Sequence, residues 1–242
     1  RDAFYQCVKE HIERPSPKST NDEADDKDEQ EEAEKLVSVG DPATFVDDFE
    51  LLQGDMAVAR AMDNRAGAWS VIEALRIAST KKSQLKCAIY ACSSIQEETG
   101  LCGAQMQVFN VKPDLAIAVD VTHATDIPGI NIKEHGLVKL GEGPVVTIGR
   151  ESHPLIVQRL KKLSTSKKLP MQVETFSLTG GTDAWAIWTK EGGIPSTILS
   201  IPNRYMHTTV EMIHLKDLEN TANLLAQFCL SIKKNESFKV KI

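Results

Sequence analysis

From Asp63 to the end of the sequence, short apolar runs alternate with longer segments whose apolar residues recur at helical spacing. The runs with the length of buried strands are 85–91, 115–119, 143–148, 172–176 and 196–201. The segments with helical periodicity are 65–78, 103–109, 153–163, 183–189 and 215–232. Strands that alternate with helices favour an α/β fold. We therefore expect a three-layer sandwich in which helices flank both faces of a mixed sheet.

The start of the chain has a different character. Residues 20–34 contain nine acidic side chains and one basic one, Lys27, without apolar periodicity, which is typical of a solvated acidic loop. Short strands are expected at 3–8, 45–46, 49–52 and 57–62. The sequence therefore divides into a small β-containing part, residues 1–52, and an α/β domain, residues 53–242.

Composition argues against several classes of partner. The net charge is −6, and the acidic run alone carries −8, so the rest of the chain is close to neutral. No stripe of Lys and Arg interleaves with aromatic residues, so we expect no nucleic-acid partner. No apolar run approaches the roughly 18 residues that a membrane span needs. The five cysteines are odd in number and lack CxxC spacing, which favours a reduced, cytoplasmic setting.

Two adjacent carboxylates, Glu97 and Glu98, follow the expected strand 85–91 and precede Gly100. Adjacent side chains on an extended segment point in opposite directions, so these two cannot serve the same atom in the same way. That geometry suits a division of labour in which one carboxylate binds a metal ion and the other moves a proton. The alternative interpretation is a solvated loop at the end of a strand.

Asp63, Asp120 and His207 also stand close to expected strand ends, and binding sites in open α/β sheets form outside the carboxyl ends of strands. Carboxylates with one imidazole suit a borderline divalent metal such as zinc, cobalt or manganese. Two such ions would need a bridging carboxylate, for which Asp63 is well placed because it sits just before a helix. Taken singly, each of these residues is more often a helix cap, a turn residue or a packed histidine. Their expected position at one edge of the same sheet favours a shared site.

Four segments that carry these residues match one family. They are Ala61–Gly67, Gln96–Leu101, Ala118–Thr122 and Arg204–Thr208. They resemble the tetrahedral dinuclear metallo-aminopeptidases, which include glutamyl, leucyl and deblocking aminopeptidases, some of them labelled endoglucanases. The motifs occur in the family's order and at roughly its spacing, and the resemblance runs from about residue 37 to about residue 228.

The resemblance implies a role for each residue of the set. Asp63 would bridge two divalent metal ions per subunit, most simply zinc, with cobalt or manganese as alternatives. Glu98 and His207 would complete one metal position, and Asp120 would belong to the other. Glu97 would be the general base.

A further match lies at Gly181, Thr182 and Asp183, which resemble a family segment that lines the active site and would bind the peptide substrate. A glycine turn capped by Thr182 or Asp183 accounts for the same residues equally well. The resemblance also implies a homo-oligomer, from dimer to dodecamer, that assembles through an inserted domain. Residues 1–52 resemble the trailing part of that insert.

One departure from the family bears on the metal site. The family has a further metal-binding histidine upstream of the insert, and no segment of this sequence matches it. His123, three residues after Asp120, is the nearest substitute. We therefore expect the metal position beside Asp120 to be open, and weak or empty.

These observations predict a metal-dependent aminopeptidase that removes N-terminal residues from peptides. A second interpretation is a non-catalytic or fragmentary relative that acts in assembly or peptide binding, which the missing histidine favours and the retention of Glu97 opposes. A third keeps the metals but changes the substrate, making the protein a deacylase of N-acyl amino acids.

Overall fold

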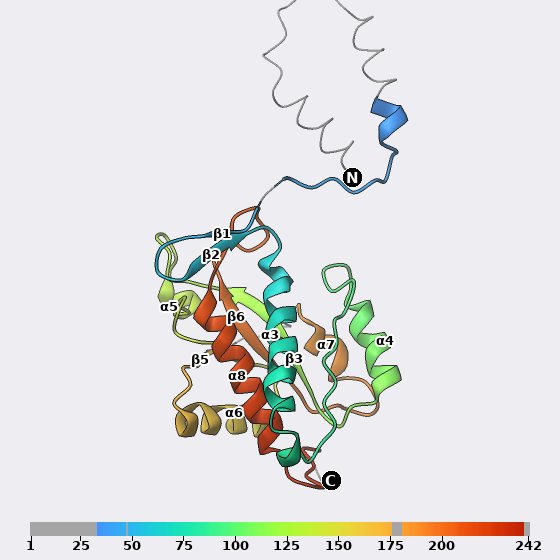
Figure 1. The fold of residues 1–242 in the computed structure, drawn as a ribbon, viewed down its shortest axis with the longest axis vertical. Helices are drawn as coiled ribbons and strands as arrows, with labels where there is room; N and C mark the ends of the chain where they lie inside the picture. The colour runs from blue at the N-terminus through green and yellow to red at the C-terminus, as the bar shows by residue number, and fades with distance from the viewer. Residues whose placement is uncertain (1–32, 47, 176–180, 240–242) are drawn as a thin grey trace, which may run out of the picture. The chain divides into compact units, whose positions relative to one another are not determined.

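The computed structural model describes residues 33–46, 48–175 and 181–239 (Figure 1). The chain falls into two units, residues 1–47 and 48–242. In the first unit, residues 33–36 form one helical turn, with the Val37 N–H donating to the Ala33 carbonyl at 2.9 Å. The expected strand at 3–8 and most of the acidic run lie outside the described residues.

A four-stranded mixed sheet forms the centre of the second unit, with the strand order β3-β6-β4-β5. Its strands are β3 (Ala116–His123), β6 (Ser196–Asn203), β4 (Val145–Ile148) and β5 (Gln172–Thr175). β3 runs parallel to β6 and β4 parallel to β5, whereas β4 and β6 are antiparallel. The expectation of a mixed sheet is confirmed.

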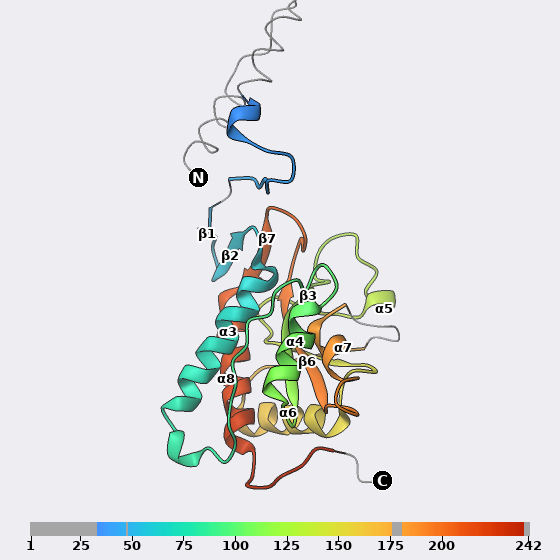
Figure 2. The same cartoon turned by 90° about the vertical axis from the view of Figure 1, so that its right-hand side faces the viewer.

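Helices cover both faces of this sheet (Figure 2). One face packs against α3 (Met62–Ser79), α6 (Pro154–Lys167) and α8 (Leu215–Ser231), and the other against α7 (Asp183–Ile187), which in turn contacts α4 (Cys102–Val111). This arrangement confirms the predicted three-layer sandwich. Two short helices, η1 (Lys82–Gln84) and α5 (Ile132–His135), lie in connections. None of the helices in the described residues is long and apolar enough to cross a membrane.

The two faces follow from the alternation of side chains along each strand. Val146 and Leu199 belong to a large buried cluster with helix residues that include Leu160 and Phe228. Their neighbours along the chain point the other way, since Ile198 of β6 packs with Ala118 of β3 and Ala184 of α7. Ala118 and Asp120 share one face of β3, so Asp120 lies on the α7 side of the sheet.

A second, antiparallel sheet connects distant parts of the chain and was only partly predicted. It consists of β1 (Glu50–Leu51), β2 (Met56–Ala59) and β7 (Glu211–His214), in that order. The apolar residues predict the first two strands, but β7 has too few of them to stand out from its loop. Residues 45–46, an expected strand, have no strand structure, and both side chains are exposed.

The expected strand at residues 85–91 is wrong. This segment has no strand structure and pairs with none of the described strands. Leu85 and Ile89 pack against the large core, whereas Tyr90 is 67% exposed. The apolar run therefore reflects one packed face, and without a neighbouring strand to satisfy its backbone groups it does not form a ladder.

Leu160 of α6 is fully buried in the large core, and Leu155 of the same helix is 49% exposed. We expect Leu160→Ala to lower the free energy of unfolding by about 2–5 kcal/mol, because it removes buried methyl groups and leaves a cavity. Leu155→Ala is the matched control and should change it by less than about 1 kcal/mol. Urea denaturation of both variants measures the difference, and similar losses would mean that α6 does not pack as described.

Candidate metal and catalytic site

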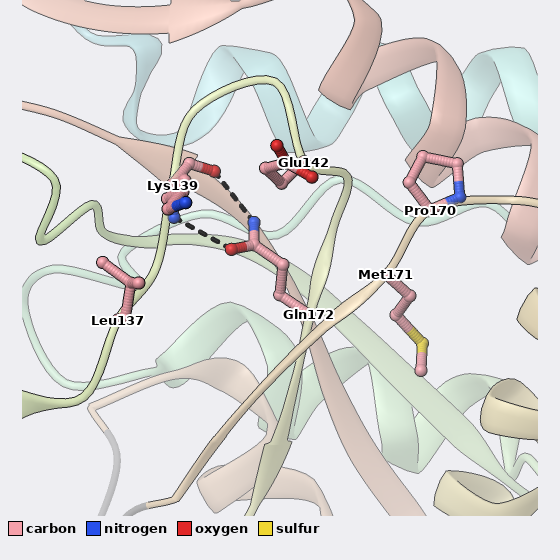
Figure 3. A pocket seen from close by; sticks show the side chains of 6 residues that line it. All are labelled: Leu137, Lys139, Glu142, Pro170, Met171 and Gln172. Atoms are coloured by element: carbon pink, nitrogen blue, oxygen red, sulfur yellow. Dashed lines mark hydrogen bonds between the residues drawn. The ribbon is translucent and has the colours of Figure 1, made fainter.

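One shallow depression of about 360 Å³ lies away from the predicted site residues (Figure 3). The Gln172 side chain crosses it and exchanges two hydrogen bonds with the Lys139 backbone, at 2.8 and 2.9 Å. The other residues lining it are Leu137, Glu142, Pro170 and Met171. None of the predicted site residues lines this depression.

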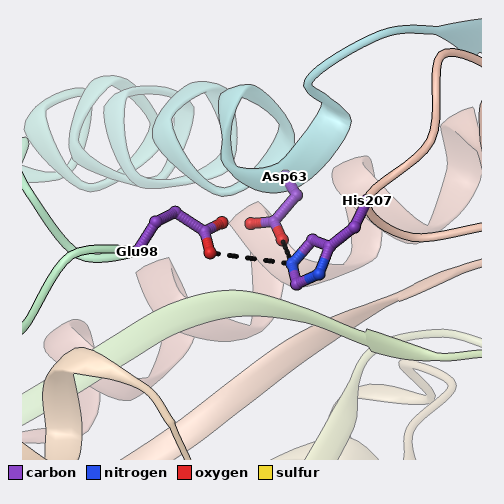
Figure 4. Close-up of side chains that lie close together, drawn as sticks. All are labelled: Asp63, Glu98 and His207. Carbon is purple, nitrogen blue, oxygen red and sulfur yellow. Dashed lines mark hydrogen bonds and ion pairs between the residues drawn. The ribbon is translucent and has the colours of Figure 1, made fainter.

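Asp63, Glu98 and His207 form a cluster of metal-donor side chains (Figure 4). One ligand atom from each lies within 4.8 Å of the other two. The Nε2 atom of His207 is 3.1 Å from Asp63 Oδ2 and 3.7 Å from Glu98 Oε2. Within the described part of the chain, His207 is the only ion-pair partner of either carboxylate. Two carboxylates and one imidazole are a donor set that a divalent cation accepts, so the cluster fits one metal ion.

Each member of the cluster has irregular backbone structure around it. Asp63 follows β2, and although it lies within the α3 range its backbone is not helical. Glu98 lies in a turn in which the N–H groups of Gly100 and Leu101 donate to the Glu97 carbonyl. His207 has a φ of 63°, in the left-handed region that few residues other than glycine adopt. The neighbouring chain therefore holds His207 in an unfavourable conformation, as functional sites often do.

Glu211 fixes the spacing of two cluster residues and was not predicted from the sequence. Its carboxylate is buried and accepts hydrogen bonds from the N–H groups of Asp63, at 3.0 Å, and His207, at 2.7 Å. Charge-assisted bonds of this kind are stronger than neutral ones. The only sequence signal was an acidic residue four positions after His207 in a short apolar stretch.

Besides the hydrogen bond to Glu211, an ion pair also restrains the segment that carries His207. Arg204 donates to both carboxylate oxygens of Asp126, from Nε at 2.9 Å and from Nη2 at 2.8 Å. Asp126 also accepts from the Leu140 N–H, and these donors hold its pKa below the usual range. Two parallel hydrogen bonds fix orientation as well as distance. The chain after β6 therefore leaves the sheet in a defined direction.

Asp120, the fourth predicted ligand, lies outside the three-residue cluster. It is buried, and its Oδ1 accepts a hydrogen bond from the Val121 N–H at 2.9 Å. Burial raises its pKa to about 8, and the negative charges of Asp63, Glu97 and Asp183 add to this rise. Asp120 is therefore close enough to the cluster to interact electrostatically with it. Its role as a metal ligand stays a prediction.

Glu97 is half-buried beside the cluster, and its Oε1 has no hydrogen-bond partner among the described residues. Burial raises the pKa of Glu97 to about 7. The nearby negative charges of Glu98, Asp183 and Asp63 also raise it, whereas His207 lowers it. Asp63 has its pKa raised to about 6, first by burial and then by Glu98 and Glu211. The site thus collects negative charge that the described residues do not neutralise.

The predicted substrate-binding residues stand at the start of α7. Asp183 accepts a hydrogen bond from the Ser94 hydroxyl through Oδ2, while its Oδ1 and the Thr182 hydroxyl are buried without a partner in the described chain. Gly181 is exposed and adjoins residues that the structure does not describe. His123, the suggested substitute ligand, stands at the end of β3 and interacts electrostatically with Glu174.

The sequence profile of the M42 glutamyl aminopeptidase family matches residues 9–224. The chain belongs to this family. A putative aminopeptidase of Acetivibrio thermocellus is 40% identical over 200 residues, which cover 81% of this chain and 58% of the relative. The predicted family resemblance is thereby confirmed.

Solved structures of TET peptidases share the fold. A TET aminopeptidase from a marine sediment archaeon of the Thaumarchaeota has a TM-score of 0.78 and 32% identity, over 84% of this chain and 57% of that one. The Pyrococcus horikoshii TET1 peptidase, which assembles into a tetrahedron or a large octahedral shell, has a TM-score of 0.71 and 28% identity over 84% and 58%. The chain thus spans little more than half the length of the relatives it matches.

The raised pKa values of Asp63, Glu97 and Asp120 predict how the stability of the metal-free protein depends on pH. Such groups bind more protons in the folded than in the unfolded state, so the free energy of unfolding falls as pH rises. For Asp120 the fall extends from its ordinary pKa of 3.8 to about 8. Asp120→Asn should therefore flatten the decline between pH 5 and 8 in urea titrations with a chelator present.

Asp114→Asn, at an exposed position close to the start of β3, is the matched control and should keep the parent's slope. Added zinc should raise stability most at the upper end of this pH range, because the metal binds the deprotonated carboxylates. If the free energy of unfolding depends on pH with the same slope in the parent and in Asp120→Asn, then burial and the neighbouring carboxylates do not raise the pKa of Asp120.

Proposed function

We propose that this M42 protein is a metal-dependent aminopeptidase that hydrolyses the N-terminal residue from peptides. The observation that carries the proposal is the Glu97 carboxylate beside the donor cluster of Asp63, Glu98 and His207, because its Oε1 has no hydrogen-bond partner among the described residues. A metal scaffold without chemistry has no need of an additional, free carboxylate at that position. The family match supports the same activity.

The proposed cofactor is a pair of divalent metal ions per subunit, with zinc first and cobalt or manganese as alternatives. Asp63 would bridge the two ions, Glu98 and His207 would hold one, and Asp120 would hold the other. When bound, the metals supply Lewis acidity toward a carbonyl oxygen and a water molecule. Charge supports this assignment: burial, and after it nearby carboxylates, raise the pKa values of Asp63 and Asp120 to about 6 and about 8, and a bound cation would offset both effects.

Glu97 is the proposed general base. A carboxyl whose pKa is about 7 can take a proton at neutral pH and return it within the same cycle. It would remove a proton from the water that attacks the first peptide carbonyl, and then deliver that proton to the departing amine. Its neighbour Glu98 points into the donor cluster, which leaves Glu97 free for this proton transfer.

Gly181, Thr182 and Asp183 are proposed to bind the peptide. The Asp183 carboxylate interacts electrostatically with Glu97 and Asp120, and its Oδ1 is free to accept a hydrogen bond. The Ser94 hydroxyl occupies the other oxygen and fixes the orientation of the carboxylate. Asp183 Oδ1 and the Thr182 hydroxyl, which have no hydrogen-bond partner in the described chain, suit the polar backbone groups of a bound peptide.

The remaining proposals concern assembly and setting. We infer a homo-oligomer, from dimer to dodecamer, because the related P. horikoshii TET1 peptidase forms a tetrahedron or an octahedral shell. Residues 1–52 would be the trailing part of the domain through which subunits associate, and residues 53–242 the catalytic domain. A cytoplasmic location is proposed from the five cysteines, four of which are free in the described residues.

Replacing Glu97 by Gln should lower turnover of aminoacyl p-nitroanilides by about 10²-fold or more, the usual scale of lost general-base catalysis. Zinc content measured by mass spectrometry should stay at the parent level, because Glu97 is not a ligand. Glu219→Gln, at an exposed position of α8, is the control. Activity within a few-fold of the parent would refute the assignment. Hydrolysis of N-acetyl amino acids in place of the anilides would indicate a deacylase.

Replacing His207 by Ala should lower zinc affinity about 10-fold or more, because it opens a coordination position. Calorimetric titration of chelator-treated protein measures this without any assay of activity. His135→Ala, at an exposed position of α5, is the matched control and should bind zinc as the parent does. Equal affinities for all three proteins would make His207 a structural residue.

A further inference from the structure

Outside the candidate site, the carboxylate of Glu174 on β5 accepts hydrogen bonds from two threonine hydroxyl groups of the same sheet. Thr147 of β4 donates to Glu174 Oε1 at 2.7 Å, and Thr122 of β3 donates to Oε2 at 2.9 Å. Thr147 and Thr122 are both buried. The Glu174 side chain therefore has one fixed position that links three strands, and sequence reasoning did not identify it.

Glu174 lies on the same side of the sheet as the proposed catalytic residues. Thr122 follows Asp120 by two positions, so both side chains point to the α7 face of β3. At roughly 3.3 Å per residue, this places Thr122 about 7 Å along the strand from Asp120. Ala118 on the same face packs with Ala184, the residue after Asp183. One sheet face thus carries Asp120 and Glu174, and α7 brings Asp183 to it.

Glu174 also lacks a cationic partner. In the part of the chain that the structure describes, no Lys or Arg forms an ion pair with it. Burial raises its pKa, while the two threonine hydroxyls and the nearby His123 oppose that rise. A carboxylate has about four lone-pair positions, and the two hydroxyls use two of them. A positively charged group from a ligand would complete its coordination and offset the cost of burial.

We propose that Glu174 selects the side chain of the substrate's N-terminal residue, favouring basic side chains and rejecting acidic ones. This inference rests on the proposed aminopeptidase function and adds a substrate class to it. A lysine side chain carries its charge at the end of a four-carbon stem, which can extend from a substrate N-terminus near Asp120 toward Thr122, the residue about 7 Å along the strand that donates to Glu174. A glutamate side chain would bring a like charge to the same position and be repelled. The family description names glutamyl aminopeptidases, so this chain would differ from that description in preference.

The experiment compares three p-nitroanilides, of lysine, norleucine and glutamate, on the zinc-loaded parent and on Glu174→Gln. Lysine and norleucine share a four-carbon stem, but only lysine carries an ammonium group, so their kcat/KM ratio isolates the charge. In the parent we expect lysine to exceed norleucine, and glutamate to be slowest. In Glu174→Gln the lysine-to-norleucine ratio should fall about 10-fold or more, the scale of a lost charged hydrogen bond. The glutamate rate should rise, and the norleucine rate should stay within a few-fold.

Glu134→Gln, at an exposed position of α5, is the control and should keep the parent's ratios. Calorimetric binding of lysinamide and norleucinamide to the parent gives a second readout that needs neither turnover nor a folded variant, and lysinamide should bind about 10-fold more tightly. Unchanged ratios in Glu174→Gln, with or without a loss of stability in urea, would show Glu174 to be only a structural link and overturn the inference.

Failure of the inference and failure of the proposed function are distinguishable. If the parent hydrolyses norleucine anilide but shows no preference for lysine over it, in rate or in amide binding, the inference alone is wrong. If the parent hydrolyses none of the three anilides, the proposed function fails. In that case the amide-binding preference still decides whether Glu174 recognises a basic side chain.

Discussion

The geometry of the candidate site depends on one buried carboxylate, that of Glu211, which accepts hydrogen bonds from the main chain of both Asp63 and His207. Glu211 begins β7, and its Cα pairs with that of Ala59 on β2, the strand that leads to Asp63. The small antiparallel sheet therefore positions the carboxylate that binds the main chain of Asp63 and His207. Because main-chain groups are held, the two side chains face each other before any metal arrives, and little ordering entropy remains to oppose binding.

The same region carries a concentration of like charge that the described residues do not neutralise. Asp63, Glu97 and Asp120 all have raised pKa values, and burial is the first cause for each. Folding without a cation must place these carboxyls in a poorly solvated region, either protonated or mutually repelling. A metal that enters the site is thus linked to folding as well as to chemistry, since it favours the folded over the unfolded chain.

Sequence reasoning succeeded where a residue's role follows from its place on a regular element. The sheet strands β3 and β6 have continuous apolar runs, so the layers of the fold could be predicted. Asp63, Glu98 and His207 could be predicted as neighbours because the short motifs that carry them match one family in order and spacing, although the strand expected before Glu98 does not form.

Sequence reasoning failed where pairing or burial depends on distant segments. Residues 85–91 have the apolar composition of a buried strand but pair with none of the described strands. By contrast, β7 pairs with β2 although its sequence has few of the apolar residues typical of a strand. Nothing in the sequence singles out Glu211 or Glu174, and only the folded chain shows that backbone amides donate to the first and threonine hydroxyls to the second.

The donor cluster is open to solvent on one side, since the side chains of Glu98 and His207 are 58% and 63% exposed, whereas that of Asp63 is 11% exposed. An ion held there keeps contact with bulk water, so no part of the described chain has to move before it leaves. Metal exchange in this chain should therefore be limited by the lifetimes of individual coordination bonds. The ion present at any moment would then reflect the relative concentrations of the available divalent cations, weighted by the softness of two carboxylates and one imidazole.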